Sequence, residues 1–151
     1  MPADLLASKM VHVLAAILWV GGTVFLAAVA APVLRTLSPE ERVALMSRIG
    51  RRFRVVGWTA LAMLVATGLH ASARLGLLSA EVLTGTAEGR LLLVKLVLVA
   101  GILALTAAHD LLLRSGGVQV PTKRRTALGL ARASGVLTVI VPVIGVLLGH
   151  G

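Results

Sequence analysis

Residues 5–34 read LLASKMVHVLAAILWVGGTVFLAAVAAPVL, and this stretch decides the fold. Apart from Lys9 and His12 it has no ionisable side chain, and a helix needs about 20 mostly apolar residues to cross a bilayer. The small residues Ala28-Val29-Ala30 imitate a signal-peptide cleavage site, but the apolar run is longer than a signal core. We therefore expect an uncleaved membrane span.

Three further apolar stretches follow, and hydrophobic residues make up 58% of the 151-residue chain. This length leaves room for four helices and their connections. The sequence predicts an all-α fold, a four-transmembrane-helix antiparallel bundle that forms a single integral membrane domain over residues 1–151. The expected spans are 5–34, 55–78, 90–113 and 127–149.

The basic residues predict the orientation. They gather between the first two spans and around the connection between the last two, and cytoplasmic connections attract Lys and Arg. Both termini are then outside, in a multi-pass protein of the inner (plasma) membrane. Orientation and anionic lipid account for the net charge of +9, so we expect the lipid bilayer as partner and no nucleic acid. The residues concerned are Arg35, Arg42, Arg48, Arg51, Arg52, Arg54, Arg114, Lys123, Arg124, Arg125 and Arg132.

Ser38-Pro39-Glu40-Glu41, in the first cytoplasmic connection, has the pattern of a capping box with proline at the first helical position. It predicts an amphipathic helix on the membrane surface, with arginines towards the lipid headgroups.

Each predicted span carries or ends in one histidine, and ionisable residues inside a membrane usually mark function. Helix direction and the rise of 1.5 Å per residue place His12, His70, His150 and Lys95 in one outer layer. His109 falls near the cytoplasmic boundary instead. Contact with the helix dipole and the lipid headgroups is enough to explain a histidine there.

Histidine can be buried neutral and is the commonest metal ligand. We expect His12 and His70 to bind a metal centre together, since neither has a carboxylate partner within the spans. His150 is the reserve ligand, although a terminal surface position explains it as well. Lys95 either neutralises an anionic group or snorkels to the headgroups, and mid-span Trp19 packs against the core or a ligand.

Three sequence elements carry a family resemblance. Lys9-Met-Val-His12-Val-Leu-Ala-Ala-Ile-Leu-Trp19-Val-Gly21-Gly22 resembles the first span of the copper-resistance D (CopD-like) membrane family. Arg51-Arg52-Phe53-Arg54 leading to Thr67-Gly68 resembles its second span, and Lys95-Leu96-Val97-Leu98-Val99 its third. The first and third of these elements, with His12…Trp19-Val-Gly21 and Lys95-Leu96-Val97-Leu98-Val99, are also similar to the HemJ-like, haem-associated membrane proteins. The resemblance implies that His12 corresponds to the first-span histidine of both groups and Lys95 to their third-span lysine.

Two site chemistries follow. Haem b requires axial histidines, a slot between helices and cations for its propionates, and His12, His70, Lys95 and glycine-rich faces supply these. We would then expect redox or diatomic-gas chemistry at the haem, as in a haem-dependent oxidoreductase. A quinone or a redox protein would be the partner. The alternative is copper binding or transport through the same histidines. Cu(I) favours sulfur ligands, whereas this chain has four methionines and no cysteine, so haem is the first expectation.

Overall fold

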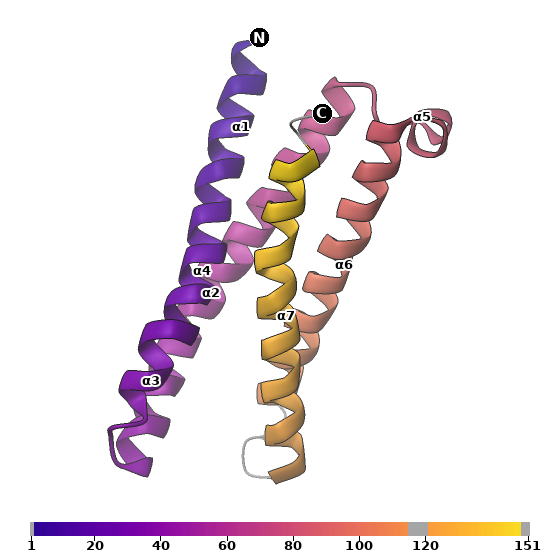
Figure 1. Cartoon of the computed structure of the whole chain (residues 1–151). Coiled ribbons are helices and arrows are strands. Elements are labelled where there is room, and N and C mark those ends of the chain that lie inside the picture. The colour runs from indigo at the N-terminus through magenta and orange to yellow at the C-terminus, as the bar shows by residue number, and fades with distance from the viewer. Residues whose placement is uncertain (1, 115–120, 149–151) are drawn as a thin grey trace. The chain divides into compact units, whose positions relative to one another are not determined.

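The computed structural model describes residues 2–114 and 121–148, and these are helical wherever they are regular. The all-α prediction is confirmed. The chain divides into two compact units, Met1–Gly76 and Leu77–Gly151, and each is an antiparallel pair of long helices described here by itself (Figure 1).

In the first unit, a continuous helical rod runs from Ala3 to Leu34. Two turns of π-helix interrupt its α-helical winding, and such turns often mark functional sites. A tight turn follows, and α4 then runs back along the rod (Figure 1). The elements are α1 (Ala3–Ala16), η1 (Ile17–Gly21), α2 (Gly22–Phe25), η2 (Leu26–Ala30), α3 (Ala31–Leu34) and α4 (Pro39–Arg74).

The predicted capping box is present at the start of α4. The Glu41 backbone N–H donates to Ser38 Oγ at 3.3 Å, and the Ser38 backbone N–H donates to Glu41 Oε2 at 3.1 Å. The helix that it begins does not stop at the membrane surface. It continues without a break for 36 residues, so the predicted amphipathic helix and second span are one element.

Two aromatic side chains pack between the two long helices in the middle of the first unit. Trp19 is only 8% exposed and stacks on Phe53, with ring centroids 6.0 Å apart and an interplanar angle of 16°. Gly57 makes room for this indole, because a Cβ built there would lie 2.7 Å from Trp19 Cζ3. Ala15 and Ala60 are buried beside it. Trp19 therefore packs against the core between the two helices.

The second unit consists of α5 (Ala80–Gly85), α6 (Ala87–Arg114) and α7 (Pro121–Leu148). Polar groups join α6 to α7. Thr106 Oγ1 and Ser134 Oγ lie 3.2 Å apart, and His109 Nδ1 donates to the Ala127 carbonyl at 2.9 Å. Hydrogen bonds of this kind between neighbouring helices help to hold apolar helices together.

Three helices are long and apolar enough to cross a membrane: Ala3–Leu34, Pro39–Arg74 and Ala87–Leu113. They contain the predicted spans 5–34 and 90–113, whereas the predicted second span, 55–78, is four residues too long, because α4 ends at Arg74 and a turn follows. The fourth predicted span, 127–149, lies within α7 except for its last residue, which is outside the described residues. Among the described residues, α7 is not one of these three helices.

Gly89 tolerates no side chain at the junction of α5 and α6. A Cβ there would overlap the Val82 carbonyl and lie 2.7 Å from Leu83 Cα, and these backbone atoms have no room to retreat. We expect Gly89→Ala to detach α5 from α6 at a cost of about 2 kcal/mol. Hydrogen exchange of the amides in α5 measures this. Gly85→Ala is the control, since nothing lies within 4 Å of its Cβ position, and equal exchange in both variants would contradict the prediction.

Candidate functional site

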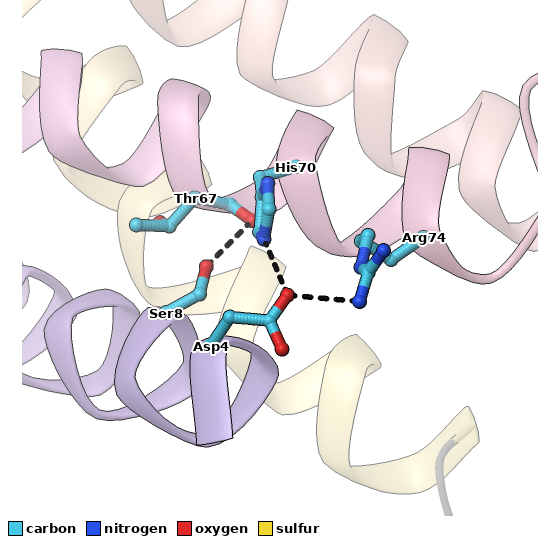
Figure 2. A network of polar contacts seen from close by, with 5 residues as sticks. All are labelled: Asp4, Ser8, Thr67, His70 and Arg74. Carbon is cyan, nitrogen blue, oxygen red and sulfur yellow. Dashed lines mark hydrogen bonds and ion pairs between the residues drawn. The ribbon is translucent and has the colours of Figure 1, made fainter. Parts of the chain in front are cut away.

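A line of polar side chains occupies one end of the first unit, where α1 and α4 run side by side (Figure 2). Asp4, Ser8 and His12 are four residues apart on α1 and therefore share one helix face. From α4, the side chains of Thr67, His70 and Arg74 meet this face.

Asp4 is the centre of an ion-pair cluster. Its Oδ2 atom lies 3.0 Å from Arg74 Nη2 and 3.8 Å from His70 Nε2 (Figure 2). The side chains are half exposed, at 47% for Asp4, 45% for His70 and 52% for Arg74. The cluster is thus open to ions from outside the helix pair, and a cation that binds Asp4 must compete with Arg74.

His12 lies two turns further along α1 and is half buried. Its Nδ1 is 2.8 Å from Thr67 Oγ1, and that hydroxyl donates its single proton to the Met63 carbonyl at 2.6 Å. Thr67 must therefore accept from His12 Nδ1–H. In the neutral ring this hydrogen bond places the lone pair on Nε2, the tautomer that metal-binding histidines commonly adopt.

Ser8 completes the line between the two histidines. Its hydroxyl donates to the Thr67 carbonyl at 3.5 Å (Figure 2). Beyond His12 the polar line ends at buried Ala15 and the Trp19 indole. These side chains form a row, here called the polar path, that begins at exposed Asp4 and ends at half-buried His12.

The structure brings His12 and His70 to neighbouring turns of the same helix pair but gives them different partners. His12 contacts Thr67, and His70 faces Asp4. The expectation that neither histidine has a carboxylate partner is wrong for His70, because the first helix begins at Ala3 and includes Asp4. The four-residue spacing of Asp4, Ser8 and His12 is the sequence signal that would have revealed this pair.

Among residues 2–114 and 121–148, no three His, Asp or Glu side chains group closely enough to hold a metal ion. The donors at Asp4 and His70 fit a metal that binds through nitrogen and oxygen, but they supply two ligands only. A Cβ at Gly68 would lie 3.6 Å from His12 Cε1, so the His12 ring packs against α4 at this level.

The other predicted site residues lie elsewhere. Lys95 is half buried on α6, in the second unit. His109 is also on α6 and connects it to α7, a structural contact that sequence reasoning missed. His150 lies outside the described residues.

Comparison with known proteins identifies the family. Residues 47–148 match the model of the family described as CopD, copper resistance protein D. No curated protein and no solved structure matches this chain. The matched segment covers α4 from Ser47 onward, with Thr67 and His70, and the whole described part of the second unit. Kinship with HemJ-like proteins stays a prediction. A match over two thirds of the sequence, on a chain with three helices able to cross a membrane, shows that this protein belongs to the CopD family of membrane proteins.

Proposed function

We propose that this protein handles copper at the membrane, with Asp4 and His70 as the first contact for the ion and His12 as the next. The family match favours copper, which was the second of the two chemistries that the sequence suggested. The observation that carries the proposal is the Asp4–His70 pair at the open end of a polar path that leads to His12.

The donor atoms favour Cu(II) over Cu(I). Imidazole nitrogen and carboxylate oxygen suit Cu(II), whereas Cu(I) prefers thioether and thiolate sulfur. The chain has no cysteine. Met10 and Met63 are 60% and 45% exposed, and neither is among the residues of the polar line. Because two donors bind an ion only weakly, we propose that copper binds here transiently, as a substrate and not as a resident cofactor.

We do not propose haem b for this protein, because the family match favours copper. Without propionates to neutralise, Lys95 is proposed to snorkel towards the headgroups. A quinone or redox-protein partner was expected only for the haem chemistry, so we do not propose one for this protein.

Titration of the purified protein with Cu(II) tests the proposal. We expect weak binding of copper with nitrogen hyperfine structure in its electron paramagnetic resonance spectrum, and no Soret band in the absorption spectrum. A protein that carries a Soret band and binds no copper would reverse the choice between the two chemistries.

We also propose that α7 is a fourth span and that both termini face outward. Support comes from the basic stretch of Arg42 to Arg54, which the positive-inside rule assigns to the cytoplasm. The cysteine-free sequence allows a direct test. We expect a membrane-impermeant thiol reagent to label Ala80→Cys in intact cells but not Ala44→Cys. Both alanines are exposed and lie on opposite sides of the predicted second span. The reverse labelling pattern would invert the orientation.

A further inference from the structure

A groove of about 330 Å³ lies on the first unit, away from the polar path. It runs between the middle of the first helix and the part of α4 where the arginine-rich segment gives way to the apolar one. Its lining is apolar except for one charged side chain: Gly22, Phe25, Leu26, Ile49, Arg52, Phe53 and Val56.

The groove has a fixed floor and open walls. The Phe53 ring fills the space over Gly22, where a Cβ would lie 2.5 Å from Phe53 Cε2, and it stacks on buried Trp19 from the other side. Phe25 and Val56 are 56% and 46% exposed and form the walls. An apolar slot of this kind on a membrane helix pair fits a hydrocarbon chain.

The charge beside the groove is strongly positive. Arg52 belongs to its lining, and Arg48 and Arg51 are exposed within the adjacent turn of α4. Glu41, two turns away from Arg48, already accepts hydrogen bonds from Ser38. A cation at one end of an apolar slot matches an amphiphile with a negative headgroup, and a basic segment beside a membrane helix attracts anionic lipid.

We propose that this groove binds one acyl chain of an anionic glycerophospholipid, with Arg52 on the lipid phosphate. The site is independent of the copper proposal, because none of its residues belongs to the polar path. Phosphatidylglycerol is the probe, and phosphatidylcholine, whose phosphate is balanced by choline, is its neutral counterpart. One basic residue near an anionic surface contributes about 1 kcal/mol, so Arg52 should give phosphatidylglycerol an advantage of about fivefold.

Trp19 provides the readout, because it stacks on the floor of the groove. The chain has two tryptophans, so a Trp58→Phe background leaves Trp19 as the single fluorophore. The full chain is reconstituted in phosphatidylcholine vesicles that contain equal fractions of acyl-brominated phosphatidylglycerol or acyl-brominated phosphatidylcholine. We expect the brominated anionic lipid to quench Trp19 at about one fifth of the mole fraction that the neutral lipid needs.

Two variants decide whether the groove is responsible. Arg52→Gln should abolish the preference for phosphatidylglycerol, whereas Arg51→Gln, which removes a neighbouring exposed arginine outside the lining, should keep it. Val56→Trp narrows the groove from an exposed wall and, read by native mass spectrometry of bound lipid, should release the lipid. Equal quenching by both lipids, equal effects of the two arginine variants, or no quenching at all would each overturn the proposal.

Discussion

Replacing Gly57 by leucine is expected to separate α1 from α4 and to lower the free energy of unfolding by about 2–3 kcal/mol. The Cβ atom alone would lie 2.7 Å from Trp19 Cζ3, and the rest of the leucine would extend into the indole ring. The ring has no space to yield, because it is 8% exposed and stacked on Phe53. Unfolding in mixed micelles with increasing denaturing detergent, followed by circular dichroism, measures the loss.

Gly50→Leu is a matched control on the same helix, two turns earlier. Nothing lies within 4 Å of a Cβ at Gly50. Both substitutions remove a helical glycine and gain about 1 kcal/mol of helix propensity, so this variant should unfold no more easily than the original protein. If both variants lose the same stability, the close approach of Gly57 to Trp19 does not hold the hairpin together.

The second large effect concerns copper. Asp4→Asn and His70→Ala each remove one of the two proposed donors, and we expect each to weaken Cu(II) binding by about tenfold or more. His109→Ala is the control histidine, because its ring is engaged with the Ala127 carbonyl in the second unit. Isothermal titration of Cu(II) into the detergent-solubilised protein measures all three.

Arg74→Gln should act in the opposite direction. Arg74 Nη2 lies 3.0 Å from Asp4 Oδ2, so the guanidinium competes with any cation for that carboxylate. Removing it should strengthen Cu(II) binding, whereas a cluster that serves only to join α1 and α4 would lose stability and gain no affinity. Tighter binding in Arg74→Gln together with weaker binding in His70→Ala would support the proposed order of contacts.

The all-helical class and the approximate places of the long helices were predictable from apolar length. Spans of 20 residues or more have few solutions other than helices in a membrane, and the capping box at Ser38 is a local pattern that needs no tertiary information. The continuity of α4 was not predicted. The arginine-rich stretch before Val55 has the composition of a surface helix, and nothing in it marks the absence of a break.

The positions of two candidate residues could be predicted, whereas their role in a site stays a proposal. The rise of 1.5 Å per residue gives the height of each side chain along its helix, and it places His12 and His70 at similar heights on one helix pair. Asp4 was missed because the expected span began at residue 5, whereas the helix begins two residues earlier, at Ala3, and so places the Asp4 carboxylate on the same face as Ser8 and His12. Partner assignment depends on side-chain rotamers, so the contact between His12 and Thr67 could not be read from spacing.

The unbroken length of α4 has a mechanical consequence. At 1.5 Å per residue, 36 residues span about 54 Å, whereas a bilayer with its headgroups is about 40–45 Å thick. A helix without a kink moves as one lever. Arg42 and Arg48 lie near one end of it and His70 and Arg74 near the other. A tilt imposed on the arginine end by the surrounding lipid is therefore transmitted along α4 to the end that carries His70 and Arg74.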